Sequence, residues 1–228
     1  DKFGIKNKEQ AEKIAEELRG ENFVVEKIER KEISKNPPTP FTTSTLQQEA
    51  AKRLGFSSKK TMVLAQHLYE NGHITYMRTD SVNLSQEAVS AAKNWLTKEL
   101  GREYALESPR FFKSKSKLVQ EAHEAVRPTH IENSPDTVGL TDEGEKKLYK
   151  LIWQRFVATQ MPAAKAALSS IDVAAGPRQG GASKYTLRAS GQQIIFDGYL
   201  KIWPQKFSEK ELPVMAKGEE LKLKDIVP

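Results

Sequence analysis

The order of hydrophobic and polar positions at the start of the chain predicts one helix followed by one long strand. Apolar side chains recur three and four residues apart over residues 8–19, which is the spacing of an amphipathic helix. Asn7 and Gln10 match a capping box at its start, and Gly20 ends it. Residues 23–33 then place apolar side chains among charged ones in near alternation, which indicates a strand with one irregularity.

A stiff, proline-rich linker at residues 35–40 separates this start from a block with helical spacing. Serine or threonine precedes each periodic stretch of the block, as expected for helix caps. Two helices with a short connection, followed at once by the strand-like residues 73–81, resemble a helix-turn-helix of the winged-helix type. The predicted helices run from Ser44 to Gly55, from Ser57 or Ser58 to Gly72, from Ser85 to Gly101 and from Thr141 to Gln160.

The pattern becomes β-like after residue 161, where short alternating stretches are separated by turns rich in Gly and Pro. The strand at residues 23–33 has no other sheet to join, so we expect both ends of the chain to build one discontinuous domain. The predicted fold class is α+β in two domains: a β-rich domain with a mainly helical domain, winged-helix or CAP-like, inserted into it. The predicted strands are 167–173, 184–189, 193–196 and 221–224, and the predicted domain segments are 1–36, 37–161 and 162–228.

Composition narrows the function classes modestly. The 228 residues carry a net charge of +6, which mildly favours a polyanionic partner such as nucleic acid. The absence of cysteine excludes disulfides, zinc–thiolate sites and thiol catalysis within these residues. No apolar run approaches the roughly 20 residues that span a bilayer, and no signal-peptide pattern opens the chain, so we expect no membrane partner and a cytoplasmic location. Because the chain starts without methionine and stops after a strand-like run, we expect a fragment.

The stretch HITYMRTDS at residues 73–81 combines a possible nucleophile with a possible activator. On a strand, Ile74, Tyr76, Arg78 and Asp80 would share one face. A phenol with a reference pKa of about 10 is a poor nucleophile at neutral pH unless cationic charge stabilises the phenolate. A guanidinium two residues away supplies that charge, and its planar fork also matches a phosphate. Spacing alone leaves open an ordinary half-buried strand.

Three motifs favour the nucleophile over an ordinary strand, because they match one protein family in the expected order along the chain. ITYMRTDS at residues 74–81 resembles the active-site tyrosine motif of the type IA DNA topoisomerases, and Met77 resembles the bacterial topoisomerase I version. PFTTSTLQQEA at residues 40–50 and QEAHEAVRPT at residues 120–129 resemble two further motifs of the family. Together the motifs cover some ninety residues, and no competing family resembles all three.

The resemblance implies a mechanism and an architecture. Tyr76 would attack one DNA strand and become linked to the 5′ phosphate, and the link would conserve the bond energy, so that religation needs no ATP. The full enzyme would pass a strand through the break and relax negative supercoils. Arg78 would stabilise the charge on the phosphate, and Asp80 would orient Arg78. The β-rich domain would be an arch, and the inserted domain would carry the tyrosine and move as a gate.

The other motifs provide candidate DNA-binding residues. His123 would bind a backbone phosphate, and Arg127 would share its face if that stretch is helical. The polar helix start that contains Thr45 and Gln47 would attract phosphate through its amides, although capping alone explains some of these residues. Gln66 and Thr75 are secondary candidates for the cleft. A basic loop at residues 102–118, which carries Lys113, Lys115 and Lys117, is either solvated surface or a further contact with phosphates. The candidates are therefore catalytic Tyr76 and Arg78, and DNA-binding His123, Arg127, Thr45, Gln47, Gln66 and Thr75.

Parts of the family's machinery are missing from this chain. The resemblance implies Mg²⁺ bound by a Toprim domain with an Asp-x-Asp cluster, and the sequence contains no Asp-x-Asp and no Gly-rich phosphate loop. We therefore expect no metal site here, no activity of the fragment alone, and two partners: single-stranded DNA and the remaining domains of the same polypeptide. The alternatives are a non-catalytic winged-helix DNA-binding module, which the weakly basic helix at residues 58–71 disfavours, and a scaffold with no nucleic-acid role.

Overall fold

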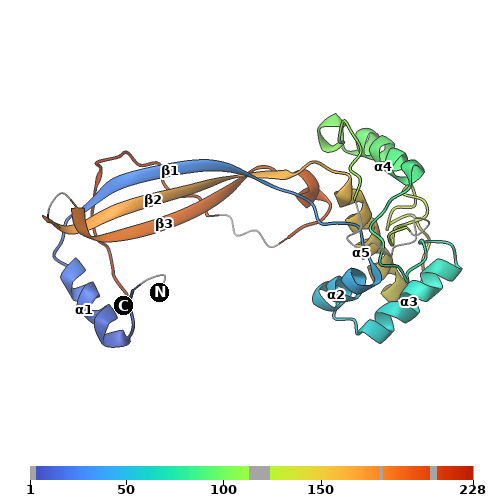
Figure 1. Cartoon of the computed structure of the whole chain (residues 1–228), viewed down its shortest axis with the longest axis horizontal. Helices are drawn as coiled ribbons and strands as arrows, with labels where there is room; N and C mark the ends of the chain where they lie inside the picture. Colours follow the sequence, from blue (N-terminus) through green and yellow to red (C-terminus); the bar gives the residue numbers. More distant parts are fainter. Residues whose placement is uncertain (1–3, 113–123, 180–181, 206–209, 228) are drawn as a thin grey trace. The chain divides into compact units, whose positions relative to one another are not determined.

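The computed structural model describes residues 4–112, 124–179, 182–205 and 210–227, and it combines helices with an antiparallel sheet (Figure 1). The chain divides into two compact units, and each is assembled from segments that are distant in the sequence. The sheet unit consists of Asp1–Ile33, Lys165–Ile195 and Phe207–Pro228. The helical unit consists of Ser34–Ala164 and Phe196–Lys206.

The sheet unit joins both ends of the chain in one sheet. Its strands are β1 (Phe23–Lys35), β2 (Ala164–Gln179), β3 (Ala182–Phe196) and β4 (Glu220–Leu221), in the order β3-β2-β1-β4. Phe23 of β1 pairs antiparallel with Leu221 of β4. The helix α1 (Lys8–Leu18) begins at Asn7, whose side chain accepts a hydrogen bond from the Gln10 N–H, so the predicted cap is confirmed.

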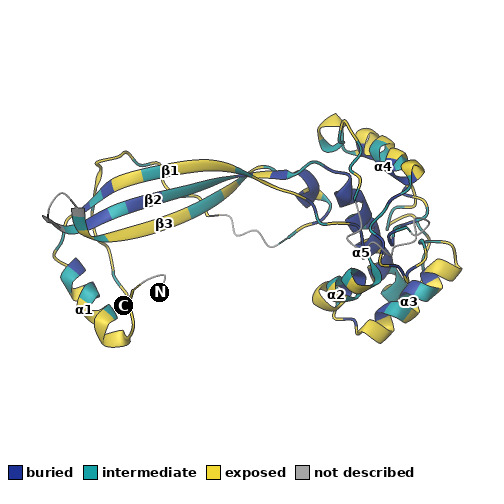
Figure 2. Cartoon of the chain, viewed as in Figure 1, coloured by how far each residue is buried: buried dark blue, intermediate teal, exposed yellow. Residues whose placement is uncertain are grey.

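The core of the sheet unit is small. Leu18 from α1, Phe23 from β1 and Ala175 from β2 are buried together, and much of the surrounding surface is exposed (Figure 2). The sequence predicted a break between strands near Gly191, but β3 runs through this position. A Cβ at Gly191 would lie 2.4 Å from the Lys210 carbonyl oxygen, so glycine here permits a close approach of another backbone segment.

The helical unit is built around one long, deeply buried helix. Leu148, Ile152 and Phe156 of α5 are each at most 2 % exposed, and Figure 2 shows this helix largely buried. The helices α2 and α3 pack against each other and against α5. A helix that is apolar around most of its circumference must lie inside its unit. The elements are α2 (Thr43–Leu54), α3 (Ser58–Glu70), α4 (Gln86–Glu99), η1 (Arg102–Tyr104), α5 (Glu143–Thr159) and η2 (Gly198–Lys201).

Two helix starts differ from the predicted positions. The N-cap of α2 is Thr42 rather than Ser44, because Thr42 and Thr45 exchange the reciprocal hydrogen bonds of a capping box. The N-cap of α5 is Asp142 rather than Thr141, since its carboxylate accepts a hydrogen bond from the backbone three residues later. The predicted caps of α3 and α4, at Ser57 and Ser85, are confirmed, as is the end of α2 at Gly55 with φ of 69°.

Residues 73–81 do not form the predicted strand. Only Ile74 makes an isolated antiparallel bridge, to Pro128, and the rest of the segment is irregular. Ile74 is 1 % exposed whereas Tyr76 is 48 % exposed, so the face that they were expected to share does not exist. Threonine side chains take the place of the hydrogen bonds that a neighbouring strand would supply. The described residues therefore lack the strand on which the winged-helix prediction depended.

A partly buried ion pair anchors the segment that lies against residues 73–81. Glu124 accepts hydrogen bonds from Arg127 Nε (3.0 Å) and Nη2 (2.8 Å), and from the backbone N–H of Ser85 (2.6 Å), the residue that caps α4. Burial raises the pKa of the Glu124 carboxyl, but the hydrogen bonds from Arg127 and Ser85 outweigh burial and hold this pKa below its usual range. The charged carboxylate therefore stabilises this part of the helical unit.

We expect Glu124→Gln to lower the free energy of unfolding of the helical unit by about 1–3 kcal/mol at pH 7. Because the folded-state pKa of Glu124 lies below the unfolded one, its contribution is present above the unfolded value near 4.3 and is lost as the pH falls through the folded value. The difference in free energy of unfolding between wild type and variant should therefore be smaller at pH 3 than at pH 7.

Tryptophan fluorescence during urea unfolding measures this effect selectively, since Trp95, Trp153 and Trp203 all lie in the helical unit. Glu132→Gln is the matched control, because the Glu132 side chain is exposed and makes no hydrogen bond or ion pair to the described residues. A gap of the same size at both pH values would refute the assigned role of Glu124.

Candidate active site

Tyr76 and Arg78 point to solvent from an irregular segment whose alternate residues are buried. Tyr76 is 48 % exposed and Arg78 is also exposed, while Met77 between them is 1 % exposed and Thr79 is 9 % exposed. Within the described part of the chain the Tyr76 hydroxyl has no hydrogen-bond partner. Asp80 is exposed as well, but neither a hydrogen bond nor an ion pair joins it to Arg78, so the structure does not support its expected orienting role.

The backbone on the C-terminal side of Tyr76 is held by one threonine of α2. Thr43 Oγ1 lies 2.7 Å from the Met77 carbonyl oxygen, to which it donates, and it accepts a hydrogen bond from the Thr79 N–H at 2.9 Å. The Thr43 N–H donates to the Thr79 carbonyl at 2.9 Å. One residue at the start of α2 thus binds both sides of Arg78 and fixes the direction of its side chain.

A second threonine holds the N-terminal side. Thr75 Oγ1 donates to the Ala125 carbonyl oxygen at 2.7 Å and accepts from the Arg127 N–H at 3.0 Å. The Thr75 N–H donates to the Arg127 carbonyl oxygen at 2.9 Å. The Thr75 hydroxyl, expected as a DNA contact, is therefore engaged with the protein backbone. Tyr76 lies between two anchored residues, Thr75 and Met77.

A neighbouring aromatic ring restricts the Tyr76 side chain. The rings of Tyr69 and Tyr76 pack edge to face, with centroids 5.2 Å apart and an interplanar angle of 64°. Such pairs contribute about 0.5–1.5 kcal/mol beyond burial, enough to favour one rotamer of an exposed side chain. Sequence reasoning missed Tyr69. The available signal was an exposed aromatic residue in the last turn of α3, off the buried stripe of that helix.

Arg78 lines a pocket at the N-terminus of α2. The pocket has a volume of about 440 Å³ and is lined by Thr42, Thr43, Ser44, Arg78, Thr79 and Asp80. The Ser44 N–H has no acceptor among the described residues. A free amide at a helix N-terminus beside a guanidinium attracts anions, because the helix dipole and the fixed charge act in the same direction. The arrangement suits a phosphate next to the phenol, and the Asp80 carboxylate at its edge opposes it in part.

The remaining predicted DNA-binding residues are distributed differently. Thr45 is engaged in the capping box of α2, and Gln66 donates to Glu70 at 2.6 Å. Gln47 is half-buried, and its side chain has no hydrogen-bond partner among the described residues. Arg127 is paired with a carboxylate and its side chain is 14 % exposed, as described above.

The helix that was predicted to place His123 and Arg127 on one face is not observed in the described residues. Residues 124–129 have no helical turn, because their backbone bonds reach across to other segments instead. His123 itself lies outside the described residues, as do residues 113–117 of the basic loop. The structure thus brings Tyr76 and Arg78 together with the start of α2.

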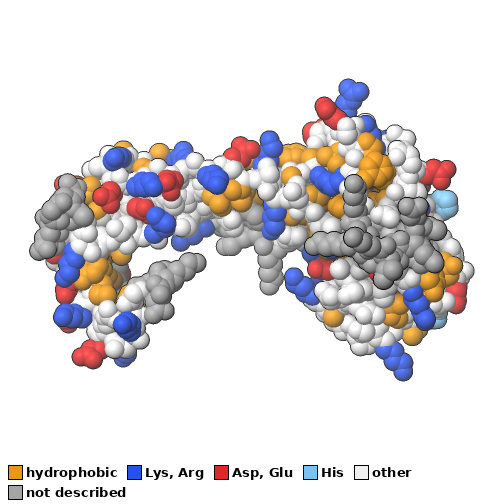
Figure 3. Space-filling model, viewed as in Figure 1, with side chains coloured by type: hydrophobic (Ala, Val, Ile, Leu, Met, Phe, Trp, Pro, Cys, Tyr) orange, Lys and Arg blue, Asp and Glu red, His pale blue; other side chains and the backbone are white. Residues whose placement is uncertain are grey.

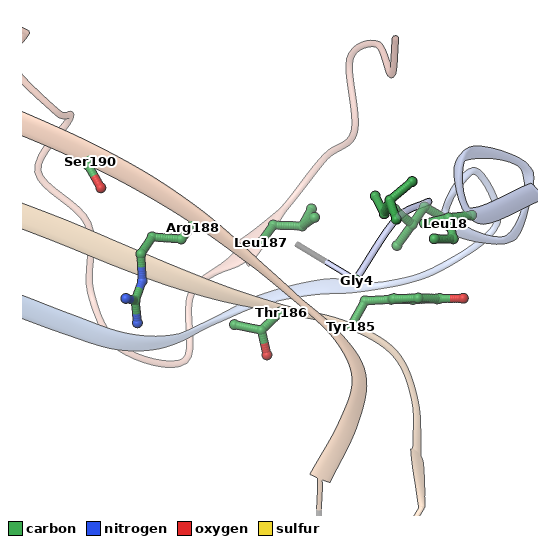
Figure 4. Close-up of a pocket in the computed structure, with 9 residues that line it drawn as sticks. Gly4, Leu18, Tyr185, Thr186, Leu187, Arg188 and Ser190 are labelled. Carbon is green, nitrogen blue, oxygen red and sulfur yellow. The ribbon is translucent and has the colours of Figure 1, made fainter. Parts of the chain in front are cut away.

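Other features of the described residues do not compete with this site. A larger pocket of about 910 Å³ lies in the sheet unit, where Figure 4 shows Leu187 of β3 extending toward Leu18 of α1 while Arg188 points away. Lys and Arg side chains on the visible face of the sheet are interspersed with Asp and Glu (Figure 3). No cluster of three or more His, Asp or Glu suited to a metal occurs in the described ranges, and no described helix is long and apolar enough to cross a membrane.

Comparison with known proteins identifies the family. The DNA topoisomerase family model matches residues 1–227. The chain is 44 % identical over 230 residues to DNA topoisomerase 1 of Haemophilus influenzae and 43 % identical over 245 residues to that of Rickettsia bellii. Each comparison covers the whole of this chain, but only 26 % and 30 % of the relatives. The chain therefore spans between a quarter and a third of their length.

A solved structure agrees with this assignment. Full-length topoisomerase I from Thermotoga maritima superimposes with a TM-score of 0.76 at 38 % sequence identity. The match covers 93 % of this chain and 34 % of that one. Sequence, fold and the resemblance of the three motifs lead to the same conclusion: the chain belongs to the DNA topoisomerase family and is similar to one segment of bacterial DNA topoisomerase I.

Proposed function

We propose that this chain is the tyrosine-bearing segment of a type IA DNA topoisomerase. In the complete polypeptide Tyr76 cleaves one DNA strand, a second strand passes through the break, and religation relaxes negative supercoils without ATP. The observation that carries the proposal is the position of the Tyr76 phenol, exposed and without a hydrogen-bond partner in the described residues. It lies two residues from the Arg78 side chain, which lines a pocket suited to an anion.

The proposed reaction exchanges one phosphate ester for another. The Tyr76 oxygen attacks the phosphorus of a phosphodiester, a bond from phosphorus to the phenolic oxygen forms, and the bond to the 3′ oxygen breaks. The phenolic proton is lost and the 3′ oxygen leaves as a hydroxyl, so the strand ends in a 5′-phosphotyrosine and a free 3′-OH. The reverse attack by that hydroxyl reseals the strand, since the ester bond energy has been conserved.

The described residues supply the electrostatic part of this step. Arg78 and the N-terminus of α2 face the place where negative charge accumulates on the phosphate oxygens. Thr43 and Thr75 act as positioning residues, because they hold the backbone on both sides of Tyr76 and have no free hydroxyl to offer the substrate. A preorganised segment reduces the reorganisation needed when the strand arrives.

The family resemblance implies Mg²⁺, and the residues described here do not fit such an ion, since they contain no acidic cluster. We infer that Mg²⁺ binds in a separate Toprim domain of the same polypeptide and that this segment alone is inactive. The partners are then single-stranded DNA and the remaining domains, in the cytoplasm. The sheet unit would serve as the arch, and the helical unit as the gate that carries Tyr76. The alternative, a winged-helix regulator, is disfavoured because residues 73–81 do not form the strand that it requires.

In the complete polypeptide, Tyr76→Phe should abolish relaxation of negatively supercoiled DNA in the presence of Mg²⁺, because phenylalanine keeps the ring and lacks the nucleophilic oxygen. Tyr69→Phe is the matched control, since it removes a hydroxyl from the partner ring and preserves the edge-to-face contact. Gel electrophoresis of topoisomers measures both. Relaxation that persists in Tyr76→Phe would refute the proposal.

Thr43→Val should lower the rate of strand cleavage about 10- to 100-fold, because a displacement of the Tyr76–Arg78 backbone by about 1 Å is costly to a reaction that depends on geometry. Thr43→Ser keeps the hydroxyl and should restore most of the rate. Single-turnover cleavage of an oligonucleotide by the complete polypeptide separates this effect from weaker DNA binding. Equal rates for the Val and Ser variants would exclude a positioning role.

A further inference from the structure

A second basic pocket lies at the opposite end of α2 from the Arg78 pocket. Its volume is about 500 Å³, and all of its lining residues belong to the helical unit. The charged groups that line it are Glu49, Lys52, Arg53 and Arg155, so positive charge exceeds negative charge by two. Such an excess in a concave surface favours an anionic ligand.

Arg155 is the unusual member of this pocket. It is 6 % exposed, and its Nε donates to the Thr39 carbonyl oxygen at 2.7 Å. Its terminal nitrogens have no acceptor among the described residues, although they line the pocket. Burial lowers the pKa of Arg155 to about 10, and the neighbouring Arg53 acts in the same direction, against Glu49. The group remains charged at neutral pH. The Phe41 ring, 4.5 Å away, stabilises this charge in part, and a buried charge without an anionic partner is still costly.

An indole ring holds two guanidinium groups at the pocket. Arg53 lies 3.9 Å from the Trp203 ring centroid and Arg155 lies 4.8 Å from it. Arg53 is also bound to Glu49 at 2.7 Å and donates to the Pro204 carbonyl oxygen at 3.1 Å. Arg53 thus forms a direct ion pair with Glu49, whereas Arg155 feels the Glu49 charge without an ion pair to any described residue. The fixed positions of the two guanidinium groups preorganise the site for a ligand.

One exposed line of α2 connects the two pockets. Ser44 lines the Arg78 pocket and Lys52 lines the second one, and Gln48 lies between them at four-residue spacing. All three are exposed, and Gln48 Nε2 donates to Ser44 Oγ at 3.1 Å. With a rise of 1.5 Å per residue, Ser44 and Lys52 are about 12 Å apart along the axis. A stacked single strand, with one phosphate per 3.4 Å, covers this distance in roughly four nucleotides.

We propose that the pocket formed by Lys52, Arg53 and Arg155 binds a backbone phosphate of the same DNA strand that Tyr76 cleaves, a few nucleotides from the scissile bond. The proposal rests on the proposed function, since it takes DNA as the ligand. Arg155 supplies the buried charge, and Lys52 supplies the mobile one. The polar line along α2 guides the strand between the two pockets.

Salt dependence of binding tests the proposal directly. For chain 1–228 and an oligo(dT) strand, log K plotted against log salt should become less steep by about 0.7 in Lys52→Gln, and binding should weaken about fivefold near 0.1 M salt. Arg53→Gln and Arg155→Lys should also weaken binding. Lys98→Gln is the matched control, because Lys98 is an exposed lysine of α4 whose side chain is 82 % exposed. Tryptophan fluorescence confirms that each variant is folded.

Each contrary result has a distinct meaning. An unchanged salt slope in folded Lys52→Gln and Arg53→Gln would show that the pocket has only a structural role, and it would overturn the proposal. The absence of oligo(dT) binding by the wild type would overturn it as well. Inorganic phosphate that alters tryptophan fluorescence in the wild type but not in Arg53→Gln, while the DNA slope stays constant across the variants, would assign the pocket to a free anion instead. Relaxation that persists in Tyr76→Phe alongside a reduced slope in Lys52→Gln would leave the phosphate site standing and remove the proposed function.

Discussion

The geometry of this site depends on two threonine hydroxyls that replace a strand. Thr43 and Thr75 bind the backbone on either side of Tyr76, and the hydroxyl of each both donates to and accepts from main-chain groups. Each such bond contributes only about 0.5–1.5 kcal/mol to stability. Their larger effect is geometric, because they keep Met77 buried and force Tyr76 and Arg78 outward in a segment that has no ladder of its own.

Much of the fold could be predicted from sequence because local signals coincided with tertiary demands. Caps at Asn7, Ser57 and Ser85 and the glycine at position 55 each satisfy a backbone requirement within a few residues. The wrong predictions concern positions whose structure depends on residues distant in the sequence. Gly191 read as a strand end, yet it admits a backbone segment some twenty residues away in sequence.

The candidate site shows the same division between local and distant signals. Tyr76 and Arg78 were predicted as site residues from their motif, and the side chains of both are exposed. The prediction of a strand that aligns them was wrong. Burial alternates from Tyr76 to Asp80, as it would on a strand, but these residues belong to no sheet. Tyr69 and the Arg155 pocket were missed altogether. An edge-to-face ring and a buried guanidinium depend on how helices pack, which periodicity along one element does not encode.

The central claim is that Tyr76, and not its neighbour Tyr69, forms the covalent bond to DNA. The most direct measurement is to trap the complete polypeptide on a single-stranded oligonucleotide with Mg²⁺, digest both components, and locate the attached nucleotide by mass spectrometry. The account predicts a nucleotide linked through its 5′ phosphate to the Tyr76 oxygen. Attachment to Tyr69 or to any other residue would contradict it.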